Sequence, residues 1–148
     1  MGAVENTRKR MQDMALEVAE KLATRGAVEA SNRFRSAIYT GDNDTEVDVV
    51  RTEDGWSVQA TGTSVLFIEF GSGVRYGYGH PQASEFDFGP GTWSEGPQGK
   101  GHWDNEKGWN IPGTREHTYG NPPAMAMYHT SQAIKRALPE VFSEVFHG

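Results

Sequence analysis

Residues 45–61, TEVDVVRTEDGWSVQAT, decide the fold expected for this chain. Apolar and acidic side chains alternate from Glu46 to Val49, which is the two-residue period of a strand with one buried face. Asp54-Gly55 is a strong signal for a two-residue hairpin turn, and the segment from Trp56 to Ala60 returns with the same period. The stretch therefore predicts an antiparallel hairpin.

A helix is expected before this hairpin, from Glu5 to about Arg25. Apolar side chains recur there at intervals of three and four residues, which places them on one helical face. The members of this stripe are Met11, Met14, Ala15, Val18 and Leu22. Gly26 is a candidate C-cap. Residues 27–35 fit either a loop or a short helix, and Ser36–Thr40 fits a short strand.

The last helix is expected to begin at Asn121-Pro122-Pro123. Asparagine suits a helix cap, and proline suits the first turn, where a missing N–H group costs nothing. The expected apolar face consists of Ala133, Ile134, Ala137, Leu138, Val141, Phe142 and Val145. Pro139 cannot donate to the carbonyl of Lys135, so a kink or a break is expected there.

The middle of the chain combines an apolar run with a long glycine-rich segment. Val65–Phe70 is almost wholly apolar, and its pattern fits either a buried strand or a short buried helix. The next fifty residues, to Gly120, carry twelve of the 18 glycines together with tryptophan and tyrosine, which indicates a long loop pinned by aromatic side chains.

These elements predict a single α+β domain over residues 1–148, because a chain of 148 residues suits one core and would leave two cores marginal. The predicted architecture is a small antiparallel β-sheet flanked by an N-terminal and a C-terminal helix. A long loop rich in glycine and aromatic residues is expected at about 71–121.

The composition excludes several classes of protein. A net charge of -6 disfavours sequence-independent binding to nucleic acid, which depends on Lys and Arg at the phosphates. The chain has no cysteine, so disulfides, thiolate metal sites and thiol nucleophiles are excluded. No segment approaches 18 consecutive apolar residues and no apolar stretch follows the N-terminal basic residues, so neither a membrane span nor a signal peptide is expected.

Constellations that could carry chemistry are weak. The candidates for a metal site are His80, His102, Asp104, His117 and His129. No pair of them has the spacing of helical metal ligands, so solvated or hydrogen-bonded loop residues are the simpler interpretation. The acidic run from Asp42 to Glu53 approaches a calcium loop but has Val47 where the sharp turn needs glycine. The spacing of Gly71, Gly73 and Gly77 misses the dinucleotide fingerprint by one residue. We therefore expect no metal, no cofactor and no enzymatic activity.

Three ordered motifs nevertheless resemble those of a known family. Phe67–Val74, FIEFGSGV, looks like the (V/I)EFG(T/S)G motif of the tail-completion, or neck, proteins of long-tailed phages. His80-Pro81 matches the HP that follows in that family, and Gly120–Tyr128, GNPPAMAMY, resembles the family's GxPPxxxMY before the C-terminal helix. Order and separation agree as well, over about Gly62 to Ile134. Where members commonly carry TGxL before the first strand, this chain has Ala30–Phe34, ASNRF.

The resemblance implies a structural role in the neck of a phage particle, with no catalytic residues. It implies an α+β domain with both helices packed on the sheet, and a homo-oligomeric ring of six copies between the head-closure protein and the tail terminator. Residues of the motifs offered as assembly contacts are Glu69, Phe70, Gly71, Gly73, His80, Pro81, Pro122, Pro123, Met125 and Tyr128. The protein would be made in the host cytoplasm and end in the virion, and an acidic ring would let DNA pass without specific binding.

Several alternatives remain open at this level. The chain could be a small module that binds a host or cell-wall partner through its aromatic loop, and a metal hydrolase using the loop histidines is a third class. The Glu69 carboxylate suits a capping or ion-pair role within the chain as well as a contact between subunits. Met125, Met127 and Tyr128 fit equally an adaptable binding surface and the first turn of a buried helix.

Overall fold

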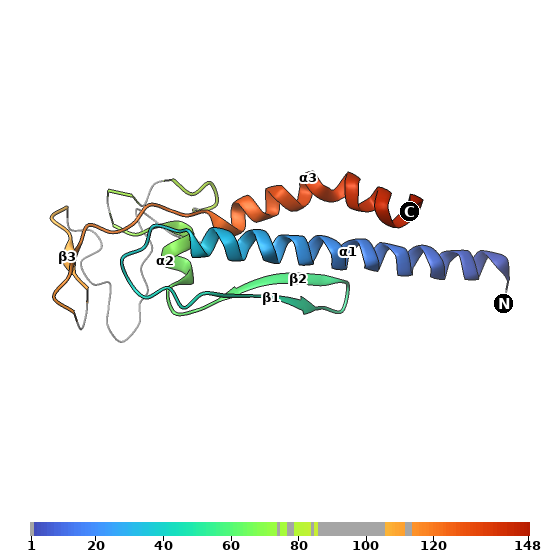
Figure 1. The fold of residues 1–148 in the computed structure, drawn as a ribbon, viewed down its shortest axis with the longest axis horizontal. Helices are drawn as coiled ribbons and strands as arrows, with labels where there is room; N and C mark the ends of the chain where they lie inside the picture. Colours follow the sequence, from blue (N-terminus) through green and yellow to red (C-terminus); the bar gives the residue numbers. More distant parts are fainter. Residues whose placement is uncertain (1, 74, 77–78, 84, 86–105, 112–113) are drawn as a thin grey trace. The chain divides into compact units, whose positions relative to one another are not determined.

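The computed structural model describes residues 2–73, 75–76, 79–83, 85, 106–111 and 114–148 (Figure 1). Its elements in chain order are α1 (Ala3–Arg35), β1 (Glu46–Arg51), β2 (Trp56–Thr61), α2 (Val65–Phe70), β3 (Trp109–Asn110), β4 (His117–Thr118) and α3 (Ala126–His147). The N- and C-terminal helices flank the small antiparallel sheet of β1 and β2, so the predicted α+β class is confirmed.

The chain forms two compact units that interleave along the sequence. The first, here named the helical unit, consists of Met1–Ser31, Val47–Gln59 and Tyr128–Gly148. The second, the loop unit, consists of Asn32–Glu46 and Ala60–Met127. The expectation of a single domain over the whole chain stays a prediction.

In the helical unit, α1 is longer than its sequence pattern indicates and runs through Gly26 to Arg35. The prediction of a C-cap at Gly26 is wrong, and residues 27–35 are helical. A Cβ at Gly26 would lie 2.6 Å from Cδ1 of Ile134 in α3 and 3.3 Å from Cγ2 of Val58 in β2. Glycine therefore lets α1 approach both neighbours, which offsets its poor helix propensity. The buried apolar residues of this unit are Val18, Ala23, Ala30 and Val141.

The hairpin of β1 and β2 confirms the strongest prediction from the sequence. The Thr52 N–H donates to the carbonyl of Gly55 at 2.9 Å. The two central residues of the turn are therefore Glu53 and Asp54, one position before the expected Asp54-Gly55. The Arg51 guanidinium lies 5.4 Å from the ring centre of Trp56, a contact between the two strands next to the turn.

Helix α3 begins later than predicted, and of the two alternatives at Pro139, a kink or a break, the break does not occur. It begins at Ala126, so the prediction that Asn121-Pro122-Pro123 open the helix is wrong. It continues through Pro139 without a break, and its ribbon is continuous and curved in Figure 1. The expected apolar face is divided, because Val141 is buried whereas Leu138 and Phe142 are each 46% exposed.

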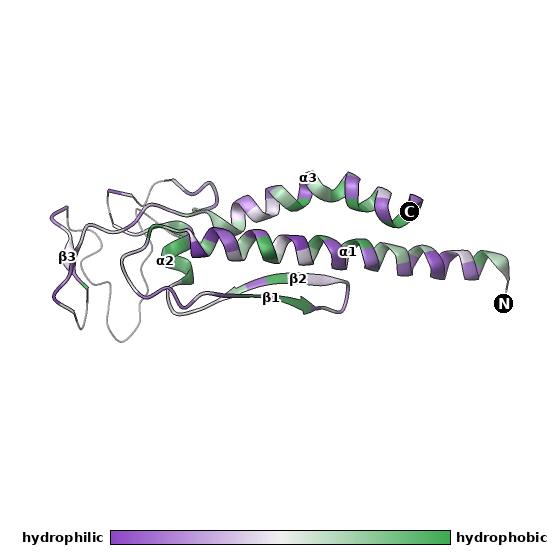
Figure 2. Cartoon of the chain, in the orientation of Figure 1, coloured by the Kyte–Doolittle hydropathy of each residue, from purple (hydrophilic) through white to green (hydrophobic). Residues whose placement is uncertain are grey.

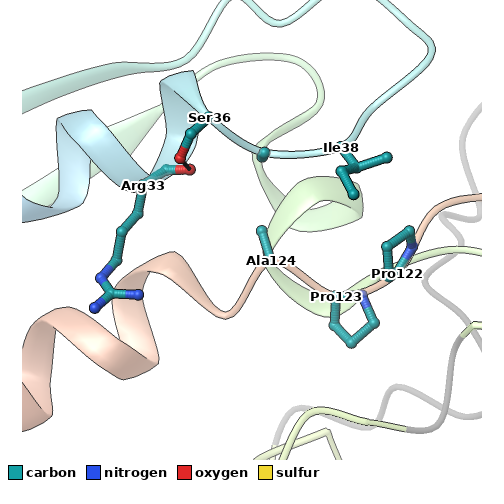
Figure 3. Close-up of a pocket in the computed structure, with 7 residues that line it drawn as sticks. Arg33, Ser36, Ile38, Pro122, Pro123 and Ala124 are labelled. Carbon is teal, nitrogen blue, oxygen red and sulfur yellow. Dashed lines mark hydrogen bonds between the residues drawn. The ribbon is translucent and has the colours of Figure 1, made fainter.

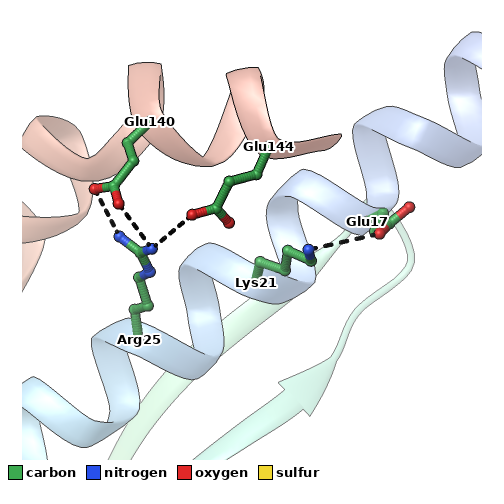
Figure 4. Close-up of polar contacts among 5 residues, drawn as sticks. All are labelled: Glu17, Lys21, Arg25, Glu140 and Glu144. Carbon is green, nitrogen blue, oxygen red and sulfur yellow. Dashed lines mark hydrogen bonds and ion pairs between the residues drawn. The ribbon is translucent and has the colours of Figure 1, made fainter. Parts of the chain in front are cut away.

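An ion-pair cluster joins α1 to α3 within the helical unit (Figure 4). Arg25 Nη1 lies 3.1 Å from Glu140 Oε2, and Arg25 Nη2 lies 3.2 Å from Glu144 Oε1. The hydrogen bond from Arg25 and its charge lower the pKa of Glu140. Because these side chains are substantially exposed to water, dissolved salt weakens the attraction between their charges. The ion pairs therefore add little to stability, and they help to fix the orientation of α1 relative to α3.

In the loop unit, Val65–Phe70 forms the short helix α2, which decides between the two alternatives left by the sequence. The predicted strand at Ser36–Thr40 is wrong, because this stretch is irregular. Its side chains bond to other parts of the unit instead. The Tyr39 hydroxyl donates to Ser64 Oγ at 3.0 Å, and the hydroxyls of Thr40 and Thr118 lie 3.3 Å apart.

The glycine-rich segment contains regular structure in its described part. Strands β3 and β4 pair antiparallel, with Trp109 opposite Thr118 and Asn110 opposite His117. Trp93 and Trp103, which the sequence offers as anchors of the loop, lie outside the described residues, as do His102 and Asp104.

Candidate functional site

The loop unit holds a buried junction in which α2 and the segment before α3 cap each other. A helix leaves its last carbonyls and its first N–H groups without partners inside the helix. The carbonyls of Ile68 and Glu69 in α2 accept from the N–H groups of Ala124 and Met125, at 2.8 and 3.1 Å. The carbonyl of Phe67 accepts from Asn121 Nδ2 at 2.9 Å. Residues 121–125 thus satisfy the C-terminal end of α2.

The Glu69 side chain does the reverse for α3. Its Oε2 accepts from the Met127 N–H at 2.7 Å, in the first turn of that helix. Its Oε1 lies 2.9 Å from His80 Nε2. Only 6% of Glu69 is exposed, and both of its oxygens have partners. The carboxylate therefore has the capping role that the sequence allowed, and its negative charge faces the positive end of α3.

His80 is held in one tautomer by a second bond. The Gln82 N–H donates to Nδ1 at 3.0 Å, so Nδ1 is an acceptor and carries no proton. The proton must then lie on Nε2, which donates to Glu69. His80 Nε2 and Glu69 Oε1 are 2.9 Å apart, as close as the atoms of an ion pair. Because Nδ1 carries no proton, however, the contact is a hydrogen bond from a neutral imidazole to a carboxylate. The Phe70 ring covers the imidazole, with ring centres 4.2 Å apart.

The HP motif has a turn as its physical basis. The carbonyl of His80 accepts from the Ala83 N–H at 3.2 Å, which closes a four-residue turn. Pro81 occupies the second position of that turn, where its fixed φ is favoured. Pro81 itself is exposed, and its role is to set the backbone that directs His80 toward Glu69.

Ser72 and Asn121 complete the junction. Each donates its backbone N–H to the other's carbonyl, at 3.0 and 3.1 Å. The Ser72 hydroxyl also donates to Asn121 Oδ1. Both residues are buried, and Asn121 is only 2% exposed. The sequence offered Asn121 as a helix cap and did not single out Ser72, whose one signal was its place between two glycines.

Glycine is required on either side of Ser72. Gly71 has φ 80°, and a Cβ there would lie 2.8 Å from the Pro123 nitrogen. Gly73 has φ 81°, and a Cβ there would lie 2.5 Å from the carbonyl oxygen of Tyr119. A side chain at either position would meet backbone atoms that cannot move aside. Both φ angles are positive, in a region that glycine enters readily and other residues rarely adopt.

The structure therefore brings most of the motif residues together in one unit. Those that meet in the junction or adjoin it are Glu69, Phe70, Gly71, Gly73, His80, Pro81, Pro122, Pro123 and Met125. Met125 has an unusual φ of 51° and is half-buried, which leaves its two interpretations open. Tyr128 belongs to the helical unit, where its ring lies 5.7 Å from that of His129.

The other candidates for chemistry have local partners. His117 bonds through Nδ1 to Asn110 Oδ1 at 3.1 Å and through Nε2 to the Lys107 carbonyl at 2.8 Å. Asp44, from the calcium-like run, accepts from the Thr63 N–H and hydroxyl, and these bonds lower its pKa. Within the described ranges, no three His, Asp or Glu side chains are grouped so that they could hold a metal ion.

One pocket of about 220 Å³ lies beside the junction in the loop unit (Figure 3). It is lined by Arg33, Ser36, Ala37, Ile38, Pro122, Pro123 and Ala124. Arg33 is the one charged residue of this lining, and its guanidinium points away from Ile38 and the two prolines. Among the described residues that line it, the pocket thus has no pair of acid and base of the kind that proton-transfer catalysis needs.

Comparison of the chain with protein-family models, with curated proteins and with solved structures found no match. No helix in the described parts of the chain is long and apolar enough to cross a membrane. Inferences about function therefore rest on the residues of the chain itself.

Proposed function

We propose that this chain is a non-enzymatic structural protein of the neck of a long-tailed phage, which joins the tail to the DNA-filled head. In this role several copies, six by the family resemblance, form a ring between the head-closure protein and the tail terminator. One observation carries the proposal: the three motifs that resemble the tail-completion family are joined by hydrogen bonds into one buried junction.

The junction gives each motif residue a physical reason. Glu69 from the first motif caps the helix that begins within the third motif, and His80 from the second motif fixes the Glu69 carboxylate. Gly71 of the first motif lets the backbone approach Pro123 of the third, and Gly73 lets it approach Gly120. Three motifs that match a family in order and spacing, and that also form one cluster, are much less expected by chance than three separate matches.

The chemistry of the junction supports scaffolding over catalysis. His80 is 1% exposed in its side chain and Glu69 is 7% exposed, so no substrate reaches their polar atoms. Their hydrogen-bonding capacity is directed to backbone groups and to each other. A rigid connection between two helix ends is what a ring subunit needs if it is to transmit the position of one partner to the next.

The negative charge supports the same role. A formal charge of -6 makes the chain a poor binder of phosphates, as a conduit for DNA requires. In the assembled particle the acidic surface would repel the passing duplex and leave it free to slide.

A reconstitution experiment tests this proposal. Filled heads and finished tails, taken from a lysate that lacks the gene, should join when purified protein is added, and infectious particles should appear. The Glu20→Gln variant, which changes an exposed side chain of α1, should restore joining as well as the unmodified protein does. Failure of well-folded protein to restore joining would contradict the neck role.

A further inference from the structure

The first turns of α1 project without cover. Residues 2–13, here named the arm, are all exposed, and in Figure 1 this end of α1 extends beyond α3 and the hairpin of the same helical unit. Val4 is 77% exposed and Met11 is 57% exposed. The first buried side chain of α1 is Val18.

The arm carries two apolar side chains in line with the buried Val18. Val4, Met11 and Val18 are spaced by seven residues, which keeps them on one face of the helix. Figure 2 shows hydrophobic and hydrophilic residues alternating along α1 as far as its N-terminal end. Because α1 is one continuous helix, the arm cannot fold back onto its own α3 or hairpin. No described part of the chain therefore covers Val4 or Met11.

Charge indicates what that molecule is. Arg8, Lys9 and Arg10 give the arm a net positive charge against Glu5 and Asp13, whereas the chain as a whole is -6. None of these three cations forms an ion pair with any described residue. The arm contributes +1 to the total of -6, so the rest of the chain carries a formal charge of -7, opposite in sign to the arm.

The hairpin of the helical unit offers an acidic surface around one half-buried valine, Val50. Val58 of β2 faces α1 at Gly26, so the alternation of a strand turns Ser57 to the opposite, outer face. The turn pairs Thr52 with Gly55, which brings Val50 of β1 to the same outer face. The exposed acids beside this face, none of them in an ion pair within the described ranges, are Asp48, Glu53 and Asp54.

We propose that the arm of one copy docks on the outer face of the hairpin of a second copy. Val4 and Met11 cover Val50, Arg8 on the same helical face meets the acids at the turn, and Lys9 and Arg10 flank the contact on either side. The contact is head-to-tail, so each copy gives one arm and accepts another, and repetition closes a ring or extends a chain. The inference rests on the self-association in the proposed function and not on the place of the ring in a phage particle.

Two other occupants fit the arm less well. A nucleic acid would meet three cations beside two carboxylates and the acidity of the whole chain, and its phosphates would leave Val4 and Met11 uncovered. An anionic membrane binds helices that carry tryptophan, phenylalanine or leucine on the apolar face, and the arm has none of these. A folded surface that is both acidic and apolar matches both properties of the arm.

The size of the contact predicts its strength. The helical part of the arm, residues 3–13, is about 17 Å long. One such contact buries less than the roughly 1,200 Å² of a stable interface. A single pair should therefore associate weakly and transiently. Ring closure would strengthen it, because every copy is then held on two sides.

Cross-linking tests this contact cleanly, because the chain has no cysteine of its own. Purified protein with Thr7→Cys in the arm and Ser57→Cys in the hairpin should form a ladder of dimers, trimers and larger species when oxidised at high concentration. The matched control combines Thr7→Cys with Ser143→Cys, an exposed serine on α3. The control should give only slow background products.

Charge reversal then assigns the partners. Arg8→Glu with Arg10→Glu should slow cross-linking about tenfold, the factor that corresponds to about 1.4 kcal/mol. Adding Glu53→Arg and Asp54→Arg should restore the rate. The proposed contact would be overturned if the Ser57→Cys and Ser143→Cys proteins cross-linked at the same rate, or if Thr7→Cys alone formed dimers as fast. A cross-linking rate that does not change with charge reversal would also overturn it. The same conclusion would follow if charge reversal abolished binding to DNA or to anionic vesicles but left the cross-linking rate unchanged.

The outcome can be separated from that of the neck proposal. Absent cross-linking in a protein that restores head–tail joining would overturn the arm contact and leave the neck role standing. Charge-dependent cross-linking in a protein whose gene can be removed without loss of joining would support the contact and contradict the neck role.

Discussion

The replacement Glu69→Gln is the sharpest test of the junction. Glutamine has the shape of glutamate, but it has one acceptor oxygen and one donor nitrogen at the end of the side chain. Both groups that face Glu69 are donors: His80 Nε2–H at 2.9 Å and the Met127 N–H at 2.7 Å. Glutamine can therefore satisfy one of them, and its own amide must face the other donor.

The expected cost follows from this mismatch. One buried hydrogen bond to a charged acceptor is lost and a donor is left unpaired, which destabilises by about 2–3 kcal/mol. Glu69→Ala removes both bonds and should cost about 3–5 kcal/mol, as when one member of a buried pair is deleted. For a chain of this size, a loss of about 2 kcal/mol lowers Tm by roughly 6–8 °C.

Urea denaturation followed by circular dichroism measures these differences. The midpoint should fall for Glu69→Gln and further for Glu69→Ala, with an unchanged slope. Glu20→Gln makes the same chemical change on an exposed face of α1 and should stay within about 0.5 kcal/mol of the parent. If Glu69→Gln is as stable as this control, then the carboxylate does not act as the cap described above.

Three further changes probe the rest of the fold. Phe70→Ala should cost about 3–5 kcal/mol through lost burial and a cavity, and unchanged stability would show that Phe70 contacts a partner instead. Gly26→Leu should destabilise by about 1–3 kcal/mol, because the added side chain meets Ile134, whereas a gain in thermal stability would contradict the close packing. Hydrogen bonds from Thr63 lower the pKa of Asp44, so its contribution is present above its ordinary pKa of about 3.9 and is lost as pH falls through the lowered value. Asp44→Asn should remove this part of the acid dependence in unfolding curves recorded from about pH 2 to about pH 6.

The parts of the fold that depend on local pattern could be predicted from the sequence. The hairpin follows from a period of two and a turn signal, both contained within residues 45–61. The end of α1 could not be predicted, because Gly26 stays helical for a reason located in Ile134 and Val58, far away in the chain. Local propensity indicates a helix end there, and tertiary packing overrides it.

The candidate site shows the same division. Its residues were found through motifs, and the positive φ angles of Gly71 and Gly73 could be anticipated. The pairing of Ser72 with Asn121 joins residues 49 positions apart, so no local pattern indicates it. Asparagine before two prolines suits a helix cap, so the sequence predicts Asn121 as the cap. In the structure the side chain of Glu69, 58 positions before Met127, caps α3.

Electron microscopy of a lysate that lacks the gene tests the central proposal most directly. The neck role predicts DNA-filled heads lying beside finished, unattached tails, because packaging and tail polymerisation proceed and only their union fails. Empty heads would place the protein at an earlier step of head assembly. Complete particles that do not adsorb to their host would instead favour a binding module. Either of these two results would contradict the role proposed for this chain.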